Sequence, residues 1–323
     1  MSSMKPVLTA FALVAVVEAM LVSAPARAAD VAAPATSPTW TFPHDVNDVA
    51  LPAQFVNGVI VIRMTVGAQS RGIDMSLDTG AGFNILDTAV MASIENATVA
   101  ESPLTITDVQ FGTATLHNVQ FASRSFARRY GTDTRIVGVL GFGFLESAVV
   151  KIDYEHETVH LINPDGFTVP KTAAVLELDP TSKVPIVSAT IGKASGRSFI
   201  IDTGASTVVA FPRLAKANPE EFTAQQELRD DAQSTYYRSF WPLCGEIRQN
   251  PYAVSHVTLG TVGIREWTVW KPDDKSCFAP AGIDGLIGYD FLRLFNVYID
   301  YPNNRVILEP NTLYEAATNT IKW

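Results

Sequence analysis

Cysteine is scarce in this sequence, and the glycine-rich motifs that bind nucleotides are absent. Only two cysteines occur in 323 residues, which excludes a small fold held together by many disulfides. The sequence has no P-loop, no Rossmann glycine pattern and no Gly-x-Ser-x-Gly elbow. This argues against a nucleotide-dependent enzyme and against an α/β-hydrolase.

Positive charge is also scarce. The chain has 24 Lys and Arg against 33 Asp and Glu, a formal net charge of -9, and no long basic run. Nucleic acid and anionic membrane surfaces are therefore poor candidates for its partner. Hydrophobic residues make up 47% of the chain and charged residues 18%, so the chain can bury a large core. Its length allows one large domain or two of about 150 residues.

The first 28 residues have the pattern of a secretory signal peptide. Lys5 precedes an apolar run from Val7 to Val22, and Ala26-Arg27-Ala28 follows as a small-x-small cleavage site. Glu18 argues against a permanent anchor, because a carboxylate at the bilayer centre costs about 2.5–3.5 kcal/mol. We expect cleavage after Ala28, with an uncleaved anchor as the alternative. The mature protein is then exported, periplasmic or secreted from a bacterium, and not held at the membrane.

Export would place Cys244 and Cys277 in an oxidising compartment, where they can form a disulfide. The sequence gives no distance between them, so two buried thiols are the alternative. Residues 29–50 are rich in Ala, Pro, Ser and Thr, which predicts a flexible linker. Regular structure is expected from near Phe55.

An apolar strand that runs into Asp-Thr-Gly-Ala occurs twice. The two copies are Met75-Ser76-Leu77-Asp78-Thr79-Gly80-Ala81 and Phe199-Ile200-Ile201-Asp202-Thr203-Gly204-Ala205. In each copy a β-rich segment and a turn come before it (59–72 and 184–196), which predicts a hairpin that ends at the aspartate. One such triplet is ordinary strand-to-turn sequence. The triplet becomes informative because a second copy occurs in the other half of the chain.

A second pair of segments repeats further along the chain. Residues 137–145 match 284–292, and the match continues at a spacing of 147 (298 minus 151) through Ile152-Asp153-Tyr154 and Ile299-Asp300-Tyr301. The aspartates are spaced by 124 (202 minus 78), so the second copy has 23 more residues between its motifs (147 minus 124). This predicts two homologous β-rich domains, 51–170 and 171–323. Helices are expected only at 88–96, at 212–232 and as single turns after Gly141 and Gly288.

The two sets of motifs, in the same order in each half, resemble the aspartic proteases. The matching residues are Asp78-Thr79-Gly80-Ala81 with Val139-Leu140-Gly141, and Asp202-Thr203-Gly204-Ala205 with Leu286-Ile287-Gly288. The chain looks most like the bacterial retropepsin-like aspartyl proteases of the pepsin and retropepsin clan. The resemblance implies an all-β fold of two homologous β-barrel domains that form an intramolecular pseudo-dimer, with few short helices. It also implies a monomer that needs no cofactor and no metal, and that binds a peptide or protein substrate in an extended conformation.

The resemblance assigns catalysis to Asp78 and Asp202. Peptide hydrolysis of this kind needs one carboxylate as general base on a water and one carboxylic acid to protonate the carbonyl. Two aspartates about 3 Å apart cannot both ionise, so they share one proton. The implied supporting residues are those of the two loops and the glycines beneath them: Thr79, Gly80, Ala81, Thr203, Gly204, Ala205, Ser206, Gly141 and Gly288. The two threonines would join the loops by hydrogen bonds.

The sequence departs from the family pattern in two places. Gly82 stands where the second copy has Ser206, so one supporting hydrogen bond is in doubt. No flap over the substrate can be identified, and the candidates are the segments 104–115 and 236–245. Tyr130, Tyr236 or Tyr237 could serve as a flap tyrosine or pack in the core.

Three alternatives stay open at this stage. The same fold can serve as a peptide-binding module without turnover, and each half can pair with another chain. A zinc metalloprotease is the third, since His156-Glu157-Thr158-Val159-His160 fits H-E-x-x-H, which needs a helix to bring both histidines to one metal. The repeat aligns His156 with Asn303 in a turn and His160 with Ile307 on a strand. It therefore predicts a hairpin at this place.

Overall fold

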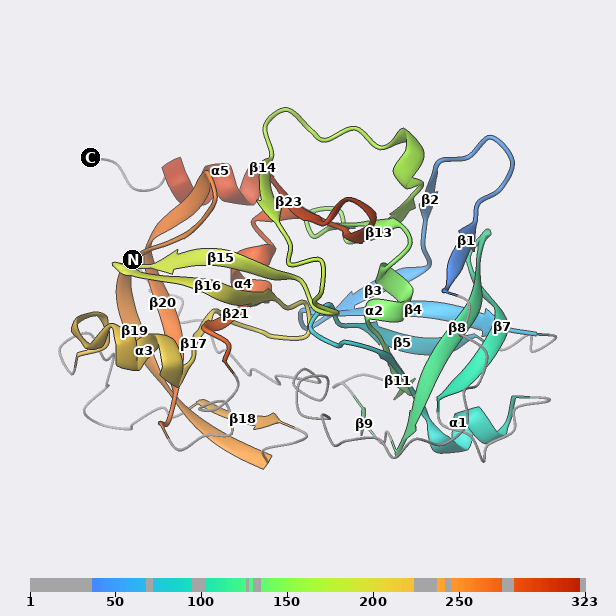
Figure 1. Cartoon of the computed structure of the whole chain (residues 1–323), viewed down its shortest axis with the longest axis horizontal. Coiled ribbons are helices and arrows are strands. Elements are labelled where there is room, and N and C mark those ends of the chain that lie inside the picture. The colour runs from blue at the N-terminus through green and yellow to red at the C-terminus, as the bar shows by residue number, and fades with distance from the viewer. Residues whose placement is uncertain are drawn as a thin grey trace, which may run out of the picture.

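The computed structural model describes residues 37–67, 72–94, 103–125, 128–129, 135–223, 237–241, 245–274 and 282–319. The fold is all-β with a few short helices and two β-barrels, which confirms the predicted fold class. Figure 1 shows the N-terminal half, in blue to green, beside the C-terminal half, in yellow to red. Within the described ranges, no helix has the length and apolar character needed to cross a membrane. The predicted signal peptide and both cysteines lie outside these ranges.

The first barrel is built from strands in the order β1-β8-β6-β11-β5-β4-β3, with β7 pairing to β4 and β8. Side chains alternate between the core and the solvent along β7 and β8, as a half-buried strand requires. Short helices α1 and α2 and a two-residue ladder complete it. The elements are β1 (Thr39–Thr41), β3 (Ala53–Val56), β4 (Val59–Val66), β5 (Ile73–Leu77), β6 (Asn84–Asp87), α1 (Thr88–Ala92), β7 (Leu104–Phe111), β8 (Ala114–Arg124), β9 (Arg128–Arg129), β10 (Arg135–Ile136), β11 (Gly138–Leu140) and α2 (Phe142–Leu145).

The second barrel repeats this plan in the order β15-β16-β21-β17-β20-β19-β18, and an extra pairing of β15 with β19 closes it. Its elements are β15 (Ile186–Ile191), β16 (Ala194–Ile201), β17 (Val209–Ala210), α3 (Pro212–Ala217), η2 (Pro219–Glu221), β18 (Tyr237–Trp241), β19 (Gly245–Leu259), β20 (Val262–Pro272), β21 (Gly285–Ile287), α4 (Tyr289–Leu292) and α5 (Thr312–Asn319).

A six-stranded sheet joins the two halves. Its order is β14-β23-β22-β12-β13-β2, and it includes β2 (Asp48–Ala50), β12 (Val149–Asp153), β13 (Thr158–Ile162), β14 (Ala174–Glu177), β22 (Phe295–Asp300) and β23 (Arg305–Pro310). The two central strands, β12 and β22, are antiparallel, and Lys151 lies opposite Tyr298. These two residues are equivalent in the repeat, so a pseudo-twofold axis passes between them. The chain is a pseudo-dimer, as predicted.

The ordered fold begins earlier than we predicted. Strands β1 and β2 lie inside the segment 29–50 that was expected to be a flexible linker. The reason is Trp40, whose ring lies 5.4 Å from the rings of both Phe111 and Phe144 and so ties β1 to the first barrel. Composition alone does not show that one partly buried aromatic residue can order such a segment.

The helix predictions were partly correct. Helices occur at 88–92, at 212–217 and as single turns after Gly141 and Gly288. Helix α5 was not predicted. The Asn311 side chain accepts hydrogen bonds from the N–H groups of Leu313 and Tyr314 at the start of α5, and the Tyr314 ring lies 5.0 Å from Phe295.

The first flap candidate, residues 104–115, forms most of the β7–β8 hairpin of the barrel wall and pairs with β4. Of the second candidate, residues 237–241 form strand β18, which pairs with β19. Tyr130 and Tyr236 lie outside the described residues.

Candidate functional site

The two aspartates end equivalent strands. Strand β5 stops directly before Asp78 and pairs in parallel with β11, while β16 stops directly before Asp202 and pairs in parallel with β21. The N–H of Asp78 donates to the carbonyl of Leu140 at 3.0 Å, and the N–H of Asp202 donates to the carbonyl of Ile287 at 3.0 Å. The apolar pairs recognised in the sequence thus hold the two aspartates at the same place in each barrel.

Thr79 and Thr203 join the two loops directly. The N–H of Thr79 donates to the Thr203 hydroxyl at 3.0 Å, and the N–H of Thr203 donates to the Thr79 hydroxyl at 3.0 Å. The Thr79 hydroxyl then donates to the carbonyl of Ile201 at 2.6 Å, and the Thr203 hydroxyl to that of Leu77 at 3.0 Å. Both side chains are buried. These four bonds bring the two aspartate motifs together across the pseudo-twofold axis.

The two carboxyl groups lie together and are buried. Asp78 is 1% exposed and Asp202 is fully buried, and the two side chains form a hydrogen bond. One carboxylate oxygen of Asp78 accepts the N–H of Gly80 at 3.0 Å, and one of Asp202 accepts the N–H of Gly204 at 2.8 Å. A Cβ at Gly204 would lie 2.6 Å from an oxygen of Asp78. Glycine therefore allows this carboxylate to sit against the opposite loop.

Burial is the largest influence on the pKa of Asp202. It raises the pKa of this carboxyl group well above its ordinary value, because a charge in a dry site is disfavoured. Hydrogen bonds from the N–H of Gly204, from the Asp78 side chain and from the N–H of Ala205 act in the opposite direction but are weaker. The arrangement therefore favours a proton on the pair of aspartates.

Gly141 and Gly288 lie against the loops, as the resemblance implied. A Cβ at Gly141 would lie 2.4 Å from the carbonyl oxygen of Ala81, and one at Gly288 would lie 2.5 Å from that of Thr207. The next residue in each copy donates its N–H to the loop: Phe142 to Ala81 at 2.9 Å and Tyr289 to Ala205 at 2.8 Å. Ser206 contributes its carbonyl, which accepts the N–H of Asp290 at 3.0 Å.

Beside the two loops, the two copies place a buried polar side chain on different elements, which was not predicted from the sequence. In the first copy the Asn84 side chain accepts the N–H of Gly141 at 2.9 Å, and a Cβ at Gly143 would lie 2.7 Å from its amide nitrogen. In the second copy the equivalent of Gly143 is Asp290, whose buried carboxyl group accepts the N–H of Val208, the equivalent of Asn84. Burial raises the pKa of Asp290 to about 8. In the aligned repeat, Asn84 stands opposite Val208 and Gly143 opposite Asp290. This difference between the two copies was the signal in the sequence.

Aromatic residues also pack across the axis in two equivalent pairs. The ring of Tyr154 lies 5.7 Å from that of Tyr289, and the ring of Tyr301 lies 5.0 Å from that of Phe142. Burial, followed by the charges of Tyr289 and Asp202, raises the pKa of Tyr154. In each pair, a tyrosine from one half of the molecule packs on the aromatic residue that follows Gly141 or Gly288 in the other half.

The H-E-x-x-H sequence lies on a hairpin, as the repeat predicted. His156 and Glu157 occupy the turn between β12 and β13, and His160 is on β13. His156 Nδ1 lies 3.0 Å from Asp153, and His160 Nδ1 lies 2.7 Å from Asp48. The two histidines face different aspartates, so the helical arrangement that a zincin requires is not formed.

The fold is that of the pepsin-like aspartic proteinases, although the sequence is far from theirs. A crystal structure of an aspartic proteinase from Irpex lacteus is similar over 84% of this chain and 100% of its own length, with a TM-score of 0.51 and 16% sequence identity. No family model matches the sequence, and the search of curated proteins gave no match. The similarity therefore concerns the fold.

Proposed function

We propose that this protein is an aspartic endopeptidase of the retropepsin-like kind, in which Asp78 and Asp202 activate a water molecule between them. The observation that carries the proposal is the pair of buried, hydrogen-bonded carboxyl groups, held in one place by Thr79 and Thr203 from two equivalent loops. A buried carboxylate is costly unless it is neutralised or used. Two of them in contact on the symmetry axis suit a shared-proton mechanism.

The two carboxyl groups divide the roles between them through one shared proton. Burial raises the pKa of Asp202 and the Asp78 side chain hydrogen-bonds to it, which supports one proton held by the pair. The protonated member donates its proton to the substrate carbonyl, and the ionised member serves as the general base that takes a proton from the attacking water. Hydrolysis breaks the C–N bond of the peptide, the water oxygen joins the carbonyl carbon, and the leaving nitrogen receives a proton from the pair.

The remaining features of the function follow from the same proposal. The substrate is a peptide or protein segment bound in an extended conformation, and a single chain supplies both aspartates, so it acts as a monomer. Export of the mature protein after removal of residues 1–28, to the periplasm or the medium of a bacterium, rests on the signal-like N-terminal sequence.

The decisive experiment is cleavage of a peptide library by the purified chain across pH, alongside Asp78→Asn and Asp202→Asn. We expect each variant to lose at least about a thousand-fold in kcat/KM, with an unchanged fold by circular dichroism. Asp45→Asn is the matched control, because that side chain is 86% exposed. Unchanged cleavage by both active-site variants would overturn the proposal. Saturable binding of peptides without any cleavage would favour the non-catalytic peptide-binding module.

A further inference from the structure

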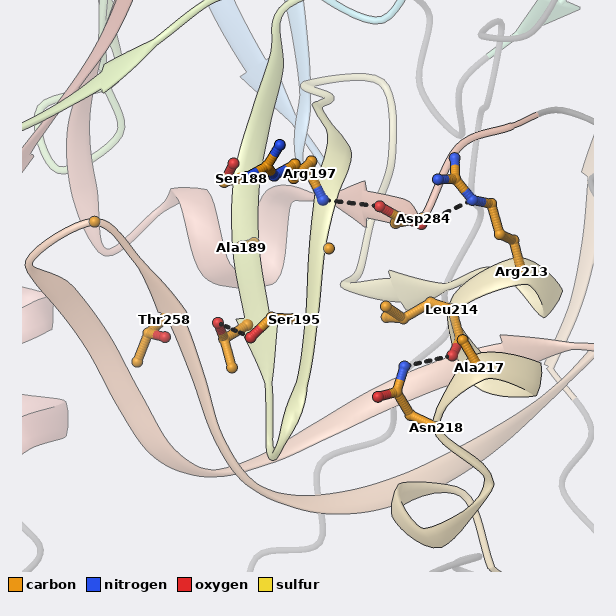
Figure 2. A pocket seen from close by; sticks show the side chains of 13 residues that line it. Ser188, Ala189, Ser195, Arg197, Arg213, Leu214, Ala217, Asn218, Thr258 and Asp284 are labelled. Carbon is orange, nitrogen blue, oxygen red and sulfur yellow. Dashed lines mark hydrogen bonds and ion pairs between the residues drawn. The ribbon is translucent and has the colours of Figure 1, made fainter.

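A cavity opens on the outer side of the second barrel, apart from the two aspartates. It has a volume of about 610 Å³ and lies among the β15–β16 hairpin, helix α3 and the turn after β19. Figure 2 shows its walls, with Arg197 and Arg213 on either side of Asp284. The volume is in the range of sites that bind small molecules.

The centre of this cavity wall is a built polar cluster. Asp284 has a side chain only 7% exposed, and one of its oxygens accepts the N–H groups of Arg197 at 2.9 Å and Ser198 at 3.0 Å. Its other oxygen lies 3.4 Å from Nε of Arg213, and Nη1 of the same arginine donates to the carbonyl of Gly282. The buried carboxylate is thus fully used to fix the strand and one arginine. This leaves the Arg197 guanidinium unengaged by any residue in the described part of the chain.

The fold itself does not require this polarity. The first barrel has positions equivalent to those around the cavity, and one hydrogen bond is found in both barrels. The N–H of Val137 donates to the carbonyl of Asp74, and the N–H of Asp284 donates to the carbonyl of Ser198. The counterparts of Arg197, Asp284 and Asn218 in the first barrel are buried aliphatic residues that belong to its core. They are Ile73, Val137 and Ile94. The second copy has replaced part of a hydrophobic core by charged and amide groups around a cavity.

The groups that line the cavity define the chemistry of an occupant. Arg197 supplies a planar fork of N–H donors that suits a carboxylate or a phosphate. Four hydroxyl groups, from Ser188, Thr190, Ser195 and Thr258, lie on the walls of the same cavity. Thr190 and Ser195 bond to each other at 3.0 Å and keep further donor and acceptor capacity. Hydroxyl groups on a ligand would find partners there.

We propose that this cavity is a second binding site, for a small hydroxylated anion such as a sugar acid or a sugar phosphate. The oxyanion binds to the guanidinium of Arg197, Asp284 holds the strand that presents Arg197, and the ligand hydroxyls bond to the serine and threonine side chains. The site is separate from Asp78 and Asp202 and does not depend on the proposed peptidase activity. Strand β16 joins the two, since it carries Arg197 and ends directly before Asp202.

The test is calorimetric titration of the full chain with glucose 6-phosphate, with glucuronate and with glucose. We expect saturable one-site binding of at least one anion and none of glucose. Binding of glucuronate alone identifies a carboxylate ligand, and binding of glucose 6-phosphate alone identifies a phosphate ligand. Asp202→Asn should bind with the same affinity as the parent chain, which separates this site from the proposed active site.

Three variants decide whether the cavity is the place of binding. Arg197→Gln should bind at least tenfold more weakly, and so should Ala217→Glu, which adds a negative charge on an exposed residue of the wall. Lys193→Gln is the control, because it removes one positive charge from the same hairpin outside the cavity. The proposal is overturned if neither anion binds, if glucose binds equally well, or if Arg197→Gln and Lys193→Gln bind alike.

Discussion

The hydroxyl groups of Thr79 and Thr203 each accept the other residue's backbone N–H and each donate to the carbonyl just before the other's aspartate. Each side chain therefore fills both of its hydrogen-bonding roles in the opposite half of the chain. Because both threonines are buried, water cannot replace a lost partner. Neither aspartate loop is complete without the other domain.

Replacing either threonine by valine should destabilise the protein. Thr79→Val leaves the N–H of Thr203 and the carbonyl of Ile201 without their partners, and an unsatisfied buried group costs about 1–3 kcal/mol. The double variant with Thr203→Val should cost less than the sum of the two single changes, because the residues share one network. Urea denaturation measures these free energies of unfolding, with the exposed Thr105→Val as control. Additive costs would show that the two threonines do not act as a unit.

The duplication made most of the site predictable from the sequence. Two motifs at spacings of 124 and 147, together with the resemblance to the aspartic proteases that they carry, were enough to expect Asp78 against Asp202, and Gly141 and Gly288 beneath the loops. The positions that escaped prediction are those where the copies differ. Asn84 on β6 and Asp290 on α4 reach equivalent places in the two barrels from different elements, and Arg197 replaces Ile73, so only the structure reveals what each exchange does. Strand β1 forms because Trp40 contacts residues that are distant in the sequence, and amino-acid composition does not encode such contacts.

The pH dependence of cleavage should follow from the raised pKa of Asp202. Burial keeps this group protonated above the ordinary range for aspartate. The pair then holds its shared proton in mildly acidic solution, and kcat/KM should fall as the pH rises through the raised pKa of Asp202. It should also fall in strong acid, where both groups are protonated. A profile of kcat/KM against pH checks this. Activity that increases steadily into alkaline solution would contradict a proton shared by the two aspartates.

A methyl group at Gly141 or Gly288 should disturb the aspartate loops. The added Cβ would lie 2.4 Å from the carbonyl oxygen of Ala81 in one case and 2.5 Å from that of Thr207 in the other. We expect Gly141→Ala and Gly288→Ala each to lower the melting temperature by several degrees and to reduce cleavage at least tenfold. Gly166→Ala is the control, because its Cβ would meet nothing closer than 3.7 Å. Equal melting temperatures for all three variants would show that the loops can yield.

Removal of metal ions should leave cleavage unchanged. His156 and His160 face different aspartates on a hairpin, so the H-E-x-x-H sequence does not form the helical zinc site. Incubation with 1,10-phenanthroline and the substitution His160→Ala should both leave kcat/KM within about twofold of the parent value. An inhibitor that mimics the tetrahedral intermediate of aspartic proteases should abolish it. The opposite pattern, loss with the chelator and none with the inhibitor, would favour the zinc enzyme.

Asp290 should make the protein less stable as the pH rises. Burial raises its pKa to about 8, while the N–H groups of Phe291 and Val208 and the charge of Arg293 act in the opposite direction. A folded-state pKa above the unfolded value means that the stabilisation is complete in strong acid and is lost as the pH rises toward 8. Asn84 shows that a neutral amide suits the equivalent place in the first copy.

We therefore expect Asp290→Asn to raise the melting temperature by several degrees at pH 7.5 and to change it little at pH 3.5. Scanning calorimetry at both pH values measures the effect. Asp165→Asn, at an exposed position, is the control and should give the same small shift at both pH values. If Asp290→Asn lowers the melting temperature more at pH 7.5 than at pH 3.5, the carboxyl group is ionised and paired with Arg293. In that case burial does not govern the protonation of Asp290, and an ion pair with Arg293 stabilises the structure next to the Asp202 loop.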